Sequence, residues 1–236
     1  GVPVATVSIG KPGATNAGVL AAQILALGDP AIAGRLERYK TKLAEKVDGT
    51  HRIVSQPPIV VPVRDLAETY GLSPEGVKSA VHAQFRAYRA TLQADRRDLL
   101  QRFQVVDVAR KVVGVGSVGT RAFIVLLQGR DDGDPLFLQV KEATASVLED
   151  HLPKSRYAQH GERVVQGQRI SYAVSDIFLG FKRSRGLDGR QRDFYVRQLW
   201  DWKASAEVER LSPAGFDVYA RMCGWTLARA HARSGD

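Results

Sequence analysis

Three glycines and one lysine are the residues of this sequence best suited to chemistry. Gly114, Gly116 and Gly119 have the spacing G-x-G-x-x-G, with Ser117 inside the loop, and Lys141 follows the last glycine by 22 residues. Because glycine has no Cβ, such a loop lets backbone N–H groups approach phosphate oxygens closely. A lysine on a nearby strand would add a point charge for the α- and β-phosphates. These residues predict a binding site for a phosphorylated ligand.

The residues that follow the loop indicate its fold. A dinucleotide-binding loop must open a helix, whose N-terminus receives the pyrophosphate. Residues 121–127 (RAFIVLL) are instead β-branched, aromatic and aliphatic with no helical period, so they predict a strand. A turn at 129–135 and a further strand at 136–142, which carries Lys141, would follow. The nucleotide lobe of a protein-kinase-like fold has the same order of elements: two strands joined by a glycine loop, followed by a strand that carries a lysine.

In such a lobe a glutamate on the next helix pairs with the lysine. We expect a helix at about residues 157–178, and Glu162 is the first candidate on it. Glu142 is the weaker candidate, because neighbouring strand residues point to opposite faces. The expected cofactor is ATP with Mg²⁺, and the five histidines lack the spacing of metal ligands, so no metal site is expected from them. The alternative is a tight glycine hairpin whose lysine forms an ordinary surface ion pair.

The remaining pattern predicts an α+β fold with two parts. Residues 77–103 and 213–232 read as helices, 193–199 as a strand, and 51–62 as an extended, proline-containing connection. Residues 1–47 read as a buried strand at 2–9 followed by helices at 16–27 and 30–47. We therefore divide the chain into an α/β strand-helix-helix segment, 1–47, and a small antiparallel sheet packed with helices, 48–236.

The amino-acid composition limits which binding partners and which cellular compartment are expected. The chain has 236 residues, a net charge of +9 and one cysteine, so it has no internal disulfide framework and a reducing cytoplasm is expected. No apolar run is long enough to span a membrane, and we expect no membrane partner. The arginines are dispersed among acidic residues, which argues against a specific nucleic-acid partner. A nucleotide remains the expected ligand.

The amino-acid sequence of the first 47 residues resembles that of a known enzyme family. Residues 1–11 (GVPVATVSIGK), 13–17 (GATNA) and 20–27 (LAAQILAL) closely resemble the C-terminal third of 5-(carboxyamino)imidazole ribonucleotide mutase, a purine-biosynthesis enzyme. The resemblance implies the last strand and closing helices of an octameric, flavodoxin-like fold. That family builds its substrate site mainly from earlier segments, which have no counterpart here, so no catalytic residue is transferred. Self-association through residues 1–47 is the expectation that remains.

From residue 48 onward the chain resembles the bacterial family called domain of unknown function 2252. The resemblance is carried by residues 106–120 (VDVARKVVGVGSVGT), 139–143 (QVKEA), 175–180 (SDIFLG) and 225–236 (WTLARAHARSGD). It implies a distant likeness to kinases and aminoglycoside phosphotransferases. In that family the segments resembling a catalytic Gly-Asp-x-His-x-x-Asn loop and a metal-binding aspartate precede the glycine loop, and nothing matching them occurs in this sequence.

We therefore expect a kinase-like, nucleotide-binding module that is incomplete for phosphotransfer. Two alternatives stay open at this point. The chain could be a purine-biosynthesis protein derived from the mutase, or retain only its oligomerising tail. It could also be a non-catalytic fusion product.

Overall fold

A computed structural model of the chain describes residues 44–47, 49–69, 71, 73–111, 120–131, 134–172, 175–185, 190–199 and 208–235. The chain divides into two units, one of residues 43–199 and one that combines 1–42 with 200–236. The strand and first helix predicted before residue 28, and the glycine loop itself, lie outside the described residues. The description below takes each unit by itself.

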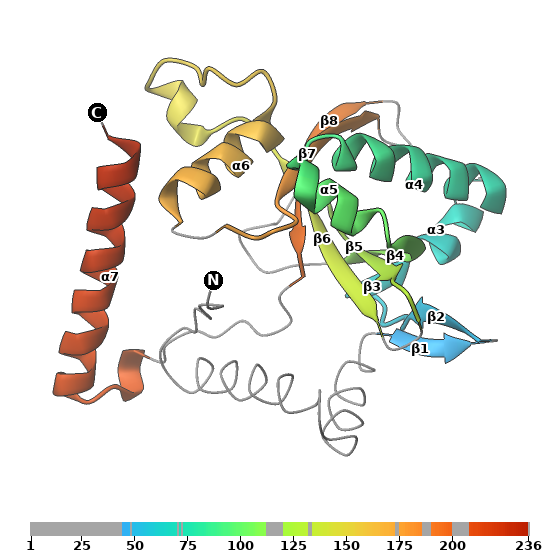
Figure 1. The fold of residues 1–236 in the computed structure, drawn as a ribbon, viewed down its shortest axis with the longest axis horizontal. Coiled ribbons are helices and arrows are strands. Elements are labelled where there is room, and N and C mark those ends of the chain that lie inside the picture. The colour runs from blue at the N-terminus through green and yellow to red at the C-terminus, as the bar shows by residue number, and fades with distance from the viewer. Residues whose placement is uncertain are drawn as a thin grey trace. The chain divides into compact units, whose positions relative to one another are not determined.

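The unit of residues 43–199 is built on a six-stranded sheet in which every neighbouring pair is antiparallel (Figure 1). The strand order is β3-β4-β5-β6-β8-β7, so β8 lies between the lysine strand β6 and the edge strand β7. The strands are β3 (Val60–Pro62), β4 (Gln104–Lys111), β5 (Ala122–Gln128), β6 (Pro135–Ala143), β7 (Gly180–Arg185) and β8 (Gln191–Gln198). A separate hairpin pairs β1 (Ala44–Val47) with β2 (Thr50–Ile53).

The helices of this unit cover the two faces of the sheet. They are α3 (Val63–Thr69), α4 (Pro74–Arg89), α5 (Ala94–Leu100) and α6 (His160–Ser171), with a 3-10 turn, η2, at Val147–Asp150. In Figure 1, α4 and α6 lie on opposite sides of the sheet. The other unit contributes η3 (Val208–Arg210) and a 22-residue helix, α7 (Pro213–Ser234). The α+β class, with a small antiparallel sheet and packed helices, is confirmed.

Strand alternation gives the sheet two chemically different faces. On the face that we call the α4 face, Phe123, Val125, Leu138 and Val140 pack with residues of α4. On the face that we call the α6 face, Ile124 and Leu126 form a second core with Ile53 of the β1–β2 hairpin. Lys141 follows Val140 on β6 and therefore belongs to the α6 face.

Helix α4 follows from its sequence pattern. Ser73 caps its N-terminus by accepting a hydrogen bond from the N–H of Gly76 at 3.1 Å. Val77, Val81 and Phe85 recur at four-residue steps and turn one stripe toward the sheet. Tyr88, buried at the end of this stripe, donates its hydroxyl to the carbonyl of Phe178 at 2.5 Å.

Three predicted helices differ from the structure. The helix predicted over 30–47 is wrong at its end, because Ala44–Val47 is strand β1, paired through the turn at Gly49 with β2. Gly49 has φ 77°, and the Asp-Gly dipeptide at 48–49 is a hairpin signal that outweighs the helical reading. The extended connection predicted over 51–62 contains β2 and β3.

The helix predicted over 77–103 is two helices, α4 and α5. The break falls at Thr91, whose hydroxyl bonds the carbonyl of Tyr88 at 2.7 Å and that of Phe181 at 3.0 Å. The helix predicted over 157–178 is confirmed only as the shorter α6, and the strands predicted over 121–127, 136–142 and 193–199 are confirmed with shifts of one or two residues at their ends. Helix α7 agrees with the prediction over 213–232.

Two glycines of α6 provide a matched test of how closely this helix approaches the sheet. A Cβ on Gly161 would lie 2.8 Å from the carbonyl carbon of Phe194 on β8, whereas a Cβ on Gly167 would meet nothing within 4 Å. We expect Gly161→Ala to lower the free energy of unfolding by about 2 kcal/mol through overpacking. Gly167→Ala should raise it by about 1 kcal/mol, because alanine favours the helix. Urea unfolding of both variants measures this, and an unchanged stability for Gly161→Ala would contradict the close packing.

Candidate functional site

Lys141 lies in the middle of the sheet, beside the point where the chain leaves the glycine-rich segment. It is half-buried on β6, opposite Ala122 of β5 on one side and Tyr195 of β8 on the other. Ala122 is the first residue of β5, and residues 112–121 connect β5 to β4. Neighbouring strands lie about 5 Å apart, so Lys141 is one strand away from the end of that segment.

Polar residues surround Lys141 on the α6 face. Gln139, two residues before it, is buried and accepts hydrogen bonds from Arg197 Nε and Nη2 at 3.3 and 3.2 Å. Burial raises the pKa of the neighbouring Tyr195 above its usual value, so its hydroxyl stays protonated at neutral pH. Around Lys141 the α6 face therefore carries a lysine, an arginine and a phenol, next to the apolar core formed by Ile124 and Leu126.

Helix α6 is fastened to the same face by one buried carboxylate. Asp193 of β8 accepts hydrogen bonds from Arg183 Nε at 2.5 Å, Arg183 Nη2 at 2.9 Å and the N–H of His160 at 2.8 Å. His160 begins α6, so the negative charge also lies at the positive end of the helix dipole. Burial alone would raise the pKa of Asp193, but these hydrogen bonds hold it below its usual value.

The two glutamate candidates occupy different places. Glu162 is half-buried in the first turn of α6, and α6 packs against β6, β7 and β8. Glu142 lies on the α4 face, where its Oε2 accepts from the N–H of Arg121 at 2.9 Å and its Oε1 lies 3.4 Å from Arg192 Nε. Glu142 therefore binds arginines on the face away from Lys141. The pairing of Lys141 with Glu162 stays a prediction, and Gly114, Gly116, Ser117 and Gly119 fall outside the described residues.

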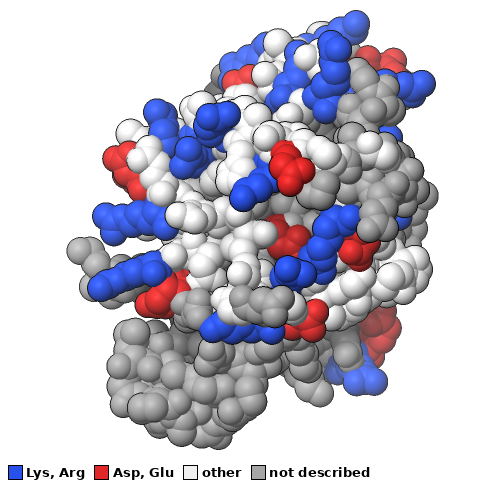
Figure 2. Space-filling view, turned by 90° about the vertical axis from the view of Figure 1, so that its right-hand side faces the viewer, with Lys and Arg blue, Asp and Glu red and all other residues white. Residues whose placement is uncertain are grey.

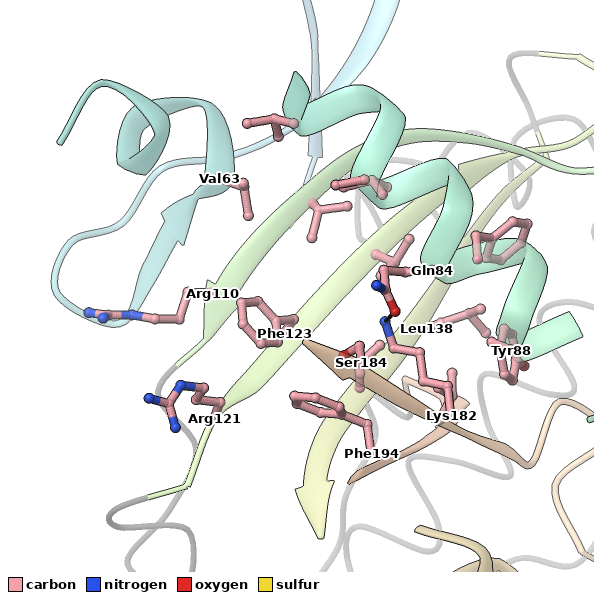
Figure 3. A pocket seen from close by; sticks show the side chains of 18 of the residues that line it. Val63, Gln84, Tyr88, Arg110, Arg121, Phe123, Leu138, Lys182, Ser184 and Phe194 are labelled. Carbon is pink, nitrogen blue, oxygen red and sulfur yellow. Dashed lines mark hydrogen bonds between the residues drawn. The ribbon is translucent and has the colours of Figure 1, made fainter. Parts of the chain in front are cut away.

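A pocket that the sequence reasoning did not anticipate lies on the opposite side, between α4 and the α4 face (Figure 3). Its volume is about 560 Å³. Its walls are mostly apolar and come from α3, α4 and five strands of the sheet. The lining residues are Val63, Leu66, Gly76, Val77, Ala80, Val81, Gln84, Phe85, Tyr88, Val108, Arg110, Arg121, Phe123, Val125, Leu138, Val140, Lys182, Ser184, Arg185, Arg192, Phe194 and Val196.

Lys182 projects into this pocket from β7. Its Nζ donates to Gln84 Oε1 at 3.4 Å and lies 5.6 Å from the ring centre of Phe194 (Figure 3). Among the described residues it has no carboxylate partner. Burial lowers its pKa to about 8, because the charged amine has lost much of its hydration. The amine nevertheless stays mostly protonated at pH 7.

The face of the molecule drawn in Figure 2 shows no single basic stripe among its described residues. Figure 2 shows Lys and Arg side chains spread over one face, with acidic and uncharged residues between them. Within the described ranges no group of three histidine, cysteine or acidic side chains is arranged to hold a metal ion. None of the helices in those ranges combines the length and apolar character needed to cross a membrane.

Comparison with known proteins places most of the chain in one family. Residues 30–236 match the family described as uncharacterized proteins conserved in bacteria, DUF2252, and the chain belongs to this family. Residues 1–46 match a second family, AIR carboxylase. The resemblances to DUF2252 and to the mutase family are thus confirmed. Matches to two families, one after the other along one chain, are typical of a fusion. No solved structure gives a significant match to the chain.

Three curated relatives of the first part of the chain are N5-carboxyaminoimidazole ribonucleotide mutases. The protein from Brucella melitensis is 49% identical over 47 residues, and that from Bacillus subtilis 53% over 47; each match covers 20% of this chain and 29% of the relative. The protein from Haemophilus influenzae is 55% identical over 40 residues, 17% of this chain and 24% of the relative. The chain spans less than a third of the length of these relatives.

The lowered pKa of Lys182 predicts how the free energy of unfolding depends on pH. Its pKa is lower in the folded protein, about 8, than the ordinary 10.5, so burial of the charged amine destabilises the fold below pH 8. Between pH 8 and 10.5 the folded protein loses this proton first, and the penalty declines. We expect Lys182→Met to raise the free energy of unfolding at pH 7 by about 2 kcal/mol, and by clearly less at pH 10.

The control is Lys78→Met, a substitution of an exposed lysine on α4 outside the pocket. It should leave stability within about 0.5 kcal/mol at both pH values. Urea unfolding at the two pH values measures both variants. A gain for Lys182→Met that is the same at pH 7 and pH 10 would show that the buried charge is not its cause.

Proposed function

We propose that residues 104–171 form a nucleotide-binding site of the protein-kinase type, in which the glycine loop and Lys141 bind the phosphates of Mg²⁺-ATP. The observation that carries the proposal is the strand register. Lys141 is paired with Ala122, the first residue of the strand that follows the glycine-rich segment. A ligand whose phosphates lie against residues 114–119 would therefore be within reach of a lysine side chain from the adjacent strand.

The order of the elements supports the same proposal. Two antiparallel neighbours, β4 and β5, are joined by the glycine-rich segment, the next neighbour β6 carries the lysine, and a helix with an acidic first turn follows. This is the order of the glycine loop, the β3 lysine and the αC glutamate in kinases. In these terms Glu162 would orient Lys141, as the αC glutamate does in protein kinases.

The proposal covers nucleotide binding and stops short of turnover. Phosphoryl transfer also requires acids that hold Mg²⁺ and a residue that orients the acceptor beside the phosphates. The sequence offers no counterpart of the family's Gly-Asp-x-His segment. A nucleotide-binding module that is incomplete for phosphotransfer is therefore the function proposed.

Titration of the full chain with a fluorescent ATP analogue and Mg²⁺ tests the proposal. We expect Lys141→Met to weaken binding about tenfold or more, because a charge-assisted contact to phosphate contributes roughly 1.5–3 kcal/mol. Glu162→Gln should weaken it less, since glutamate acts through the lysine. The matched control is Lys154→Met, an exposed lysine in the segment before α6, which should bind like the parent.

A second comparison decides which lysine is involved. Lys182→Met removes a cation from the other face of the same sheet and should leave nucleotide affinity unchanged. Loss of binding in Lys182→Met with normal binding in Lys141→Met would move the nucleotide to the α4 face. Equal titration curves for the parent and Lys141→Met would remove the assignment of Lys141.

The match of residues 1–46 to the mutases favours a second candidate. Identity of 49–53% over 47 residues indicates common descent of this segment with the mutases of B. melitensis and B. subtilis. We propose that it acts as an oligomerising tail. A non-catalytic fusion product is the alternative that the same match leaves open.

A further inference from the structure

The pocket between α4 and the sheet has the dimensions of a small-molecule site. Its volume of about 560 Å³ falls within the range of pockets that bind drug-sized ligands, roughly 300–1,000 Å³. Phe123, Val125, Leu138 and Val140 form its floor, and Val77, Val81 and Phe85 of α4 form the opposite wall. Such walls would accept an apolar chain or ring, because burying apolar surface provides most of the binding free energy.

The charged residues that line the pocket in the described part of the chain are all cationic. They are Arg110, Arg121, Lys182, Arg185 and Arg192. Glu142 lies beside this set and forms ion pairs with two of its members, Arg121 and Arg192. In Figure 3, Arg110 and Arg121 lie together at one end while Lys182 and Gln84 point toward each other deeper in the pocket.

Lys182 is the strongest indication of a ligand. Lys182 is half-buried, and an ammonium group that has lost much of its hydration normally has a carboxylate partner, because desolvation otherwise makes it costly. Here its contacts within the described residues are an amide oxygen at 3.4 Å and an aromatic ring at 5.6 Å. An anionic group from a ligand would supply the missing negative charge while the apolar walls receive the rest of the molecule.

We propose that this pocket binds an amphipathic anion, a molecule with an apolar chain or ring and one carboxylate or phosphate head. Lys182 and Gln84 contact the head, and the residues of α4 and the strand floor hold the apolar part. The site is on the face opposite Lys141 and does not depend on the proposed nucleotide site. It therefore gives the sheet a second ligand of different chemistry.

Isothermal titration of the full chain tests the proposal with ten-carbon probes. Decanoate and decyl phosphate, each below its micelle-forming concentration, represent the two anionic heads, and the tighter of the two identifies the head. Decanol lacks the charge, decyltrimethylammonium has the opposite charge, and acetate lacks the chain. We expect at least one anionic probe to bind at least tenfold more tightly than all three of these.

Two substitutions locate the binding site. Lys182→Met should weaken binding of the anionic probe at least tenfold, and Ala80→Phe, which adds a ring to a lining position of α4, should block it. Their controls are Lys78→Met and Ala83→Phe, exposed residues of the same helix outside the pocket, and both should bind like the parent. Urea unfolding confirms that each variant is folded before titration.

Three outcomes would overturn the proposal. The first is the absence of heat for both anionic probes. The second is equal affinity for decanol and the anions, which would indicate apolar adsorption without recognition of charge. The third is normal binding in both Lys182→Met and Ala80→Phe, which would place the ligand elsewhere on the chain.

Discussion

The buried carboxylate of Asp193 is the interaction on which the arrangement of the sheet and its α6 face depends. It joins three segments that are separate in the sequence: β8, which carries it, β7 through Arg183, and the N-terminus of α6 through His160. Only 5% of Asp193 is exposed, so removal of one partner would leave a buried charge unpaired at a cost of about 3 kcal/mol or more. Because Gly161 follows immediately, the same contact sets how closely α6 approaches β8.

This anchoring allows one sheet to present two unlike surfaces. Odd-numbered residues of β6 turn Gln139 and Lys141 toward the α6 face, and even-numbered residues turn Leu138 and Val140 into the pocket under α4. The first surface is polar and lies beside the end of a glycine-rich segment. The second is apolar with cations among its walls. The nucleotide site proposed for one face and the amphipathic-anion site proposed for the other both rest on this two-residue period.

The sequence predicted what local patterns determine. The strand that carries Lys141, the strand after the glycines and helix α7 each have a clear sequence pattern and clear ends, and each is found in the structure. The sequence predicts a helix up to residue 47 because the residues before the Asp-Gly pair at 48–49 are good helix formers. Residues 44–47 form a strand instead, because they pair with β2. Helix α6 is shorter than expected because the backbone turns extended at Tyr172. Asp176, inside the predicted helix, instead accepts hydrogen bonds from the N–H groups of Phe178 at 2.8 Å and of Gln198 on β8 at 2.7 Å.

The pocket between α4 and the sheet could not be predicted in this way. Lys182 and Gln84 are 98 residues apart and meet only because α4 lies across β7, a tertiary contact that no local pattern specifies. The lysine is also one of many cations in a basic chain, so its type alone carried no signal. By contrast, Lys141 can be proposed as a site residue from the sequence alone, because a loop motif and a strand pattern precede it at a known spacing.

Hydrogen exchange of the full chain, measured with and without a Mg²⁺-ATP analogue, tests the central claim most directly. The account predicts that the nucleotide slows amide exchange in peptides covering residues 104–128, in β6 and in the first turns of α6, and leaves α4 and β7 unchanged. Slower exchange confined to α4 and β7 would place the nucleotide in the pocket of Lys182. Identical exchange throughout at saturating nucleotide would contradict a nucleotide site on this sheet.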